Sequence, residues 1–172
     1  IDGDRLTELE IDVFMLLLSV AGNETTRNAT AHGMHALLTN PDQFTLLKSD
    51  VEKHLDTAVD EIIRWASPVL HIRRTTTEPT ALLEQEIEKG SRVVMWYLSA
   101  NRDEDVFTDP FVFDITRTPN DNIAIGGGGA HYCLGANLAR AEPLACGITP
   151  VSITKGLGSS NAVSYTHLRA HE

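Results

Sequence analysis

Apolar residues recur every three or four positions along the first forty residues of the chain, which is the repeat of an α-helix. Thr7 and Glu10 have the spacing of a capping box, so a helix is expected to begin near Glu8. It should run to about residue 39, where an Asn-Pro pair ends it and begins a short second helix. Gly22 and its polar neighbours are poor helix formers, so we expect a weak point near the middle of the long helix.

Beyond residue 50 the pattern changes from helical repeats to alternation and then to loops. The expected elements, in chain order, are a helix over 51–65, strands over 69–77 and 92–97, an ordered meander over 103–122, a four-glycine loop over 126–129 and a helix over 134–142. Pro143 is expected to end the last helix. The fold class predicted is mainly α, with a small β-pair in an α+β arrangement.

Composition places the chain among ordinary globular proteins. Its 172 residues include 14 Lys and Arg against 24 Asp and Glu, a net charge of −10. This balance argues against nucleic acid as a partner, because phosphate binding relies on clustered basic side chains. The longest apolar run, residues 13–21, is too short to span a membrane, and no secretory signal pattern opens the chain. Two cysteines cannot form a disulfide scaffold, so we expect a cytoplasmic protein.

The last thirty residues differ from the rest of the chain. Hydrophobic periodicity and most charged side chains are confined to residues 1–142, which we interpret as one partial domain. Residues 143–162 are rich in glycine and serine and are interpreted as a diverged or misjoined segment. Residues 163–172 (VSYTHLRAHE) resemble the translation of a sequencing adapter, so they are excluded from the search for a site.

The strongest candidate for chemistry is Cys133, which follows the four-glycine loop and precedes a predicted helix. The loop lacks the glycine spacing of a dinucleotide-binding loop and the lysine of a P-loop. A cysteine at a helix start lies near unpaired N–H groups and the positive end of the helix dipole, which favours its thiolate form. A thiolate suits a soft metal or haem iron, whereas the simpler interpretation is a small buried cysteine in a turn.

Three weaker features accompany this loop, and each also has a purely structural explanation. Glu61 and Arg64 can pair on one helical face, as exposed ion pairs often do. Glu24 and Thr25 could relay protons in the long helix, or could occupy a tolerated irregularity. The arginine pair at 73–74 could bind carboxylates, or could protect the edge of a sheet from aggregation.

The order of these features resembles the C-terminal half of a cytochrome P-450, a haem-thiolate monooxygenase. The resemblance covers about residues 1–142 and rests on AGNETT at 21–26, ExxR at 61–64, FDxxR at 113–117 and GGGGAHYCLGANLAR at 126–140. The last motif is most similar to actinobacterial members that hydroxylate steroid side chains and methyl-branched lipids at a terminal methyl group. The fold implied is the C-terminal part of the P-450 fold, with a long central helix, a small β-pair and a cysteine haem loop.

The resemblance also implies roles for the residues of this loop. Cys133 resembles the axial thiolate ligand of haem b, in a loop framed by Gly126 and Gly135. His131 and Arg74 resemble the residues that bind the haem propionates.

Matching residues outside the loop complete the implied site. Glu61, Arg64 and Arg117 resemble the buried structural triad of the family. The family's oxygen-binding helix is matched in the long helix by Ala21, Gly22, Glu24 and Thr25. In this resemblance Glu24 and Thr25 would supply protons for O2 activation. One departure is Ile125, which stands where the family usually has an aromatic residue.

The implied function is insertion of one oxygen atom of O2 into a C–H bond of a small hydrophobic substrate, a steroid or branched lipid. Electrons would come from ferredoxin and ferredoxin reductase, and this chain would be a fragment that is inactive alone. One alternative is a haem-binding sensor or carrier without oxidation chemistry, which would not need Glu24 and Thr25. Another is a metal site of His131, Cys133 and Cys146, for which no fourth ligand has zinc-like spacing.

Overall fold

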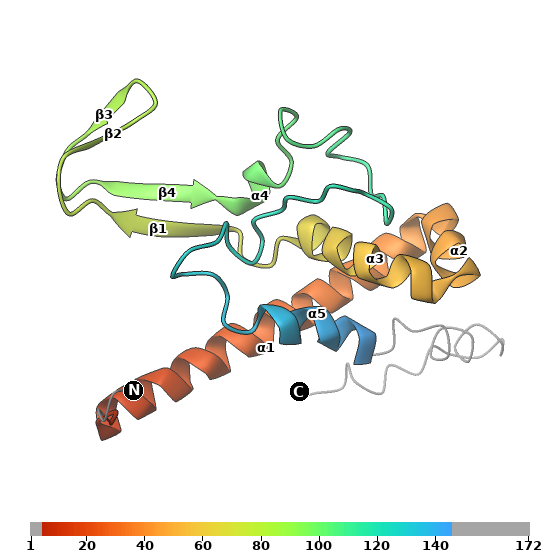
Figure 1. Cartoon of the computed structure of the whole chain (residues 1–172), viewed down its shortest axis with the longest axis horizontal. Helices are drawn as coiled ribbons and strands as arrows, with labels where there is room; N and C mark the ends of the chain where they lie inside the picture. The colour runs from red at the N-terminus through yellow and green to blue at the C-terminus, as the bar shows by residue number, and fades with distance from the viewer. Residues whose placement is uncertain (1–4, 146–172) are drawn as a thin grey trace, which may run out of the picture.

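The computed structural model describes residues 5–145 of the chain. Its elements are α1 (Glu8–Thr39), α2 (Pro41–Ser49), α3 (Val51–Ala66), β1 (His71–Thr75), β2 (Thr80–Leu82), β3 (Gln85–Ile87), β4 (Arg92–Trp96), α4 (Tyr97–Ala100) and α5 (Ala136–Ala145). Figure 1 shows α2 and α3 near the C-terminal end of α1, with β1 and β4 extending away from the helices. The mainly α architecture with a small antiparallel sheet is the one predicted.

Helix α1 begins at the predicted capping box and continues without interruption to the Asn-Pro pair. The Thr7 backbone N–H donates to the Glu10 carboxylate at 2.8 Å, and the Glu10 N–H donates to the Thr7 hydroxyl at 3.3 Å. Although a weak point was expected near Gly22, α1 stays helical through this residue. A single glycine costs a helix only about 1 kcal/mol, which the other turns of a 32-residue helix can offset.

The hydrophobic core lies between α3, the second half of α1, α2 and the meander. Its larger cluster consists of Ala36, Leu37, Phe44, Leu47, Ala58, Ile62, Phe113 and Ile115. A smaller cluster joins Val59 and Ile63 of α3 to Ala124, and Ile125 packs against it. Ile125 therefore contributes to apolar packing at the position where an aromatic residue was expected.

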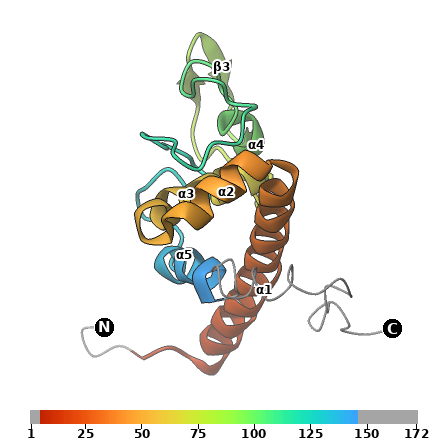
Figure 2. The same cartoon turned by 90° about the vertical axis from the view of Figure 1, so that its right-hand side faces the viewer.

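The first half of α1 extends beyond the other elements in both views (Figures 1 and 2). Large apolar side chains on this half are exposed, among them Leu9, Ile11, Val13, Phe14, Met15, Leu16, Leu17, Leu18 and Val20. The core of the described residues therefore uses only the second half of the helix.

The strands are shorter than predicted. β1 and β4 form an antiparallel pair in which Arg74 lies opposite Val93. Between them, β2 and β3 form a second antiparallel pair, and the short helix α4 follows β4. The sequence reading did not predict these three elements, because segments of three or four residues are too short for a periodic pattern.

The last described helix does not end where it was expected to end. Helix α5 continues through Pro143 to Ala145, so the expectation that Pro143 stops it is wrong. Proline removes one backbone N–H but fixes φ near the helical value, and this proline lies in the last turn of the helix. Residues 146–172, with the segment compared to a sequencing adapter, lie outside the described residues.

Candidate functional site

The loop before α5 is shaped by glycines and by backbone hydrogen bonds. Gly126, Gly128 and Gly129 have φ values of +99°, +101° and +76°, which side-chain-bearing residues rarely adopt. The loop is closed by a hydrogen bond from the Cys133 N–H to the Ile125 carbonyl oxygen at 3.2 Å. The backbone therefore holds Cys133 beside the start of the loop.

Cys133 is an exposed free cysteine. The Ala136 N–H donates to the Cys133 carbonyl oxygen at 3.1 Å, so the cysteine begins the turn that leads into α5. The exposure of Cys133 disagrees with the simpler interpretation of the sequence, which was a small buried cysteine in a turn.

His131 and Arg74 are both exposed, on different parts of the fold. Arg74 lies on β1 and donates to the carbonyl oxygen of its neighbour Arg73 at 3.1 Å. His131 lies in the glycine loop, two residues before Cys133. No hydrogen bond joins either side chain to Cys133 in the part of the chain that the structure describes.

The candidate proton-relay residues lie on one stretch of α1. The Thr25 hydroxyl donates to the Ala21 carbonyl oxygen one turn earlier. Glu24 forms an exposed ion pair with Arg27 at 2.9 Å. A Cβ atom at Gly22 would meet nothing within 4 Å, so the side of the helix that carries this glycine is uncovered.

Glu61 is the centre of a buried ionic network. Its carboxylate accepts two hydrogen bonds of 2.7 Å from Arg64 and one of 3.2 Å from the Arg117 Nε. The Asp114 N–H and the Asn120 side-chain amide each donate to it at 3.1 Å. The structure thus brings together the three residues of the suggested triad, with the side chains of Glu61 and Arg64 fully buried.

Arg64 extends this network from α3 to two later segments of the chain. Its Nη1 donates to the Asn101 carbonyl oxygen at 2.7 Å and to the Pro110 carbonyl oxygen at 3.0 Å. A buried guanidinium needs a partner for each N–H group, so these hydrogen bonds hold the backbone at Asn101 and Pro110 against α3.

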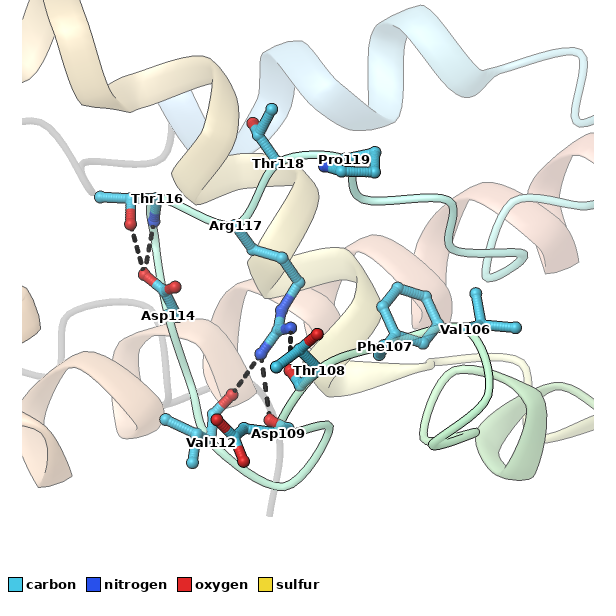
Figure 3. Close-up of a pocket in the computed structure, with 10 residues that line it drawn as sticks. All are labelled: Val106, Phe107, Thr108, Asp109, Val112, Asp114, Thr116, Arg117, Thr118 and Pro119. Atoms are coloured by element: carbon cyan, nitrogen blue, oxygen red, sulfur yellow. Dashed lines mark hydrogen bonds between the residues drawn. The ribbon is translucent and has the colours of Figure 1, made fainter.

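Arg117 is held in the meander by backbone oxygen atoms (Figure 3). It donates to the carbonyl oxygens of Thr108 at 2.6 Å, Asp109 at 3.2 Å and Val112 at 2.9 Å. These groups line a pocket in the meander, and Figure 3 shows the guanidinium directed at the three carbonyl groups rather than outward. The arginine is therefore part of the scaffold and is not an open anion site.

A second ionic contact joins the cysteine loop to α3. The Arg140 Nε donates to Asp60 at 2.9 Å, and the Arg140 Nη1 donates to the Tyr132 hydroxyl at 3.2 Å. The pKa of Arg140 is raised above its usual range, first by the hydrogen bond with the Tyr132 hydroxyl and to a smaller extent by the hydrogen bond with Asp60. The sequence reading missed this contact, because its residues are up to 80 positions apart.

Asn101 is the other residue that the sequence reading missed. It is fully buried and connects the end of α3 with the segment that leads to the glycine loop. Its only signal in the sequence is a polar residue after a strand, which is equally typical of a turn.

Comparison with known proteins agrees with the fold and the motifs. The family model for cytochrome P-450 matches residues 1–146. A methyl-branched lipid omega-hydroxylase of Mycobacterium tuberculosis is 54% identical over 142 residues, which are 83% of this chain and 33% of the relative. A steroid C26-monooxygenase of Rhodococcus jostii is 55% identical over 142 residues, 83% of this chain and 30% of the relative.

Solved structures give the same assignment. A cytochrome P-450 of Mycobacterium marinum in complex with pseudoionone matches with a TM-score of 0.84 and 44% identity, over 90% of this chain and 37% of that one. The chain belongs to the cytochrome P-450 family. It spans about a third of the length of the curated relatives that it matches.

The described residues fit the haem group that is typical of this family. They offer an exposed thiol in a loop where a Cβ atom at Gly128 or Gly129 would meet nothing within 4 Å. They contain no group of three histidine, cysteine or acidic side chains placed to hold a metal ion by themselves, and Cys146 lies outside them. None of the described helices has the length and apolarity needed to cross a bilayer.

Proposed function

We propose that these residues form the haem-binding part of a monooxygenase that inserts one oxygen atom of O2 into a C–H bond of a steroid or methyl-branched lipid. The observation that carries the proposal is the exposed Cys133 thiol between the four-glycine loop and the start of α5. The substrate class is supported by the names of the relatives, a lipid omega-hydroxylase and a steroid C26-monooxygenase.

Cys133 is the residue that would hold the iron of haem b, through its thiolate. Gly126 and Gly135 frame the loop, and its uncovered glycines leave space for a flat ring to approach the backbone. His131 and Arg74 are the proposed donors to the haem propionates, which are anionic and so favour exposed basic side chains. Haem held by a cysteine thiolate supplies the activation of O2, because the thiolate favours cleavage of the O–O bond.

The overall reaction consumes one O2, two electrons and two protons, and it produces the hydroxylated substrate and water. A ferredoxin and its reductase are the proposed source of the electrons. Thr25 and Glu24 are the proposed route of the protons. The Thr25 hydroxyl oxygen can accept a hydrogen bond from a proton donor, while its own hydrogen points to the Ala21 carbonyl oxygen. Glu24 is exposed and can exchange protons with water.

A change of the iron ligand tests this function. The carbon monoxide complex of reduced haem has a strongly red-shifted Soret band when a thiolate is the other ligand. A full-length cytochrome P-450 that carries these residues should show this band, and its Cys133→His variant should bind haem without it. A variant that keeps the shifted band would refute the assignment of Cys133. A wild-type protein with the band that forms no hydroxylated steroid or lipid with ferredoxin and reductase would instead support a sensor or carrier.

A further inference from the structure

Asn101 occupies the junction between the buried ionic network and the cysteine loop. It follows α4, and none of its surface is exposed. Its backbone carbonyl oxygen accepts the 2.7 Å hydrogen bond from Arg64. Asn101 is therefore fixed to α3 by its main chain, which leaves its side chain to contact other segments.

The side-chain amide of Asn101 connects the C-terminal end of α3 with the segment that precedes the glycine loop. Its Nδ2 donates to the Ser67 hydroxyl at 2.9 Å, and its Oδ1 accepts from the Ile123 backbone N–H at 2.8 Å. The amide orientation is determined by these partners, because a backbone N–H can only donate and must face the oxygen. Ser67 in turn donates to the Arg64 carbonyl oxygen at 2.7 Å, so the end of α3 is part of the same chain of bonds.

Ile123 is the point at which this chain of bonds reaches the cysteine. The Ile123 carbonyl oxygen accepts from the Gly126 N–H at 2.8 Å, which forms the turn that opens the glycine loop. Ile125, within that turn, accepts the hydrogen bond from the Cys133 N–H. A shift of the Ile123 backbone would therefore move the segment that holds Cys133.

We propose that Asn101 is a positioning residue for the iron ligand: its side-chain oxygen holds the Ile123 N–H and so fixes the backbone against which Cys133 is held. This inference rests on the proposed function, because it assumes that Cys133 binds haem iron. A purely space-filling role would not require an amide, since an apolar residue of similar volume fills a core without burying polar atoms.

The test compares two variants that remove different parts of the same chain of bonds. Asn101→Ala removes the acceptor of the Ile123 N–H. Ser67→Ala is the matched control, because it removes the other partner of the Asn101 amide and leaves the Ile123 contact in place. Both variants are made in a full-length, haem-loaded cytochrome P-450 that carries these residues.

The measurement is the rate at which the red-shifted Soret band of the carbon monoxide complex is lost in mild denaturant. One buried hydrogen bond changes a local equilibrium by up to about tenfold. We therefore expect Asn101→Ala to lose the shifted band up to about tenfold faster than Ser67→Ala. Equal rates for Asn101→Ala and Ser67→Ala would overturn the role of Asn101. A wild-type protein without the shifted band would overturn the proposed function itself.

Hydrogen exchange of the wild-type protein gives a second readout that does not depend on a variant folding. The Ile123 N–H should exchange far more slowly than exposed loop amides such as that of Gly128, because its partner is a buried side chain. Exchange of the Ile123 amide at the rate of the exposed loop amides would also overturn the proposal.

Discussion

Gly33 on α1 lies directly against Ile62 on α3: a Cβ atom at position 33 would lie 2.5 Å from the Ile62 Cγ2 atom. Both residues are buried, and Ile62 belongs to the larger core cluster. The glycine therefore allows the two helices to approach each other. Although alanine is the better helix former, Gly33→Ala should lower the free energy of unfolding, by about 1–2 kcal/mol, because overpacking of a core outweighs the gain in helix propensity. Denaturant unfolding measures this change.

Gly22→Ala is the matched control for that prediction, in the same helix. A Cβ atom at Gly22 meets nothing within 4 Å, so only the propensity effect remains. This variant should be as stable as the wild type or more stable, by up to about 1 kcal/mol. If both alanine variants stabilise the protein equally, the contact between Gly33 and Ile62 does not limit the packing of the helices.

The buried carboxylate of Glu61 should dominate the stability of the scaffold. Glu61→Gln keeps the shape of the side chain but leaves the Arg64 and Arg117 guanidinium groups without a counter-charge, and Arg64 is fully buried. Loss of one partner of such a pair costs about 3–5 kcal/mol. Thermal and denaturant unfolding should both show the loss.

Glu24→Gln is the control for Glu61→Gln, because Glu24 also pairs with an arginine three residues later in a helix. Its side chain is 60% exposed and that of Arg27 is 67% exposed, so solvent screens the pair. The change should alter the free energy of unfolding by less than about 0.5 kcal/mol. Similar losses in the two variants would mean that burial does not determine the contribution of Glu61.

The capping box predicts a pH effect at the start of α1. Hydrogen bonds from the backbone N–H and side chain of Thr7 lower the pKa of Glu10 below its usual value. A carboxylate with a lowered pKa in the folded state stabilises that state above its unfolded pKa, and this contribution is lost as the pH falls through the folded pKa. Thr7→Ala removes the hydroxyl of residue 7 and keeps its backbone N–H, so in an NMR titration the pKa of Glu10 should return only part of the way toward its usual value. An unchanged titration would show that the Thr7 hydroxyl does not bond to Glu10 in solution.

The sequence predicted the elements whose pattern is local. The capping box, the Asn-Pro boundary and the spacing of Glu61 and Arg64 each involve residues within one helical turn of each other. Such features depend on interactions between neighbouring residues, so a sequence pattern can predict them. The sequence order of the motifs then suggested the family, which the comparisons show.

The contacts that the sequence could not predict join distant segments. The Asn101 side chain is hydrogen-bonded to Ile123, which is 22 positions away in the sequence, and Arg140 is hydrogen-bonded to Asp60, which is 80 positions away. No periodicity encodes such pairs, because they depend on how α3, α4 and α5 pack in three dimensions. The end of α5 was predicted wrongly for a different reason. The rule that proline ends a helix describes average helices, and it does not fix the last residue of a particular one.

We expect residues 1–172 alone not to hydroxylate a substrate. Apolar side chains along the first half of α1 are exposed, so nothing among the described residues encloses a hydrophobic substrate beside that helix. Exposed apolar surface of this kind also favours aggregation. The purified chain should be incubated with haem, ferredoxin, reductase and a steroid, and the product should be measured beside that of a full-length relative. Product formation at a similar rate would contradict this expectation.

Thr25 provides the most direct test of the proposed proton route. In a full-length protein that carries these residues, Thr25→Ala should leave haem binding and the carbon monoxide spectrum unchanged. It should lower the amount of product formed per reductant consumed, and raise the hydrogen peroxide released, because the hydroxyl that accepts from and positions the incoming proton donor is lost. Acid–base groups typically contribute a factor of 10²–10⁴, but water can replace part of a lost hydroxyl, so we expect a loss of coupling of about tenfold or more.

The structure also offers a competing explanation, because the Thr25 hydroxyl donates to the Ala21 carbonyl oxygen and so acts on the helix itself. Such bonds between a hydroxyl and a carbonyl one turn earlier are common in helices and carry no chemistry. The coupling and the melting temperature of Thr25→Ala, measured side by side, separate the two explanations, and Thr25→Ser is the control that keeps the hydroxyl and loses only the methyl group. If the proton route is correct, Thr25→Ser should restore most of the coupling that Thr25→Ala loses. If Thr25→Ala instead keeps its coupling and lowers only the melting temperature, Thr25 is a structural residue of α1, and the protons must reach O2 by another route.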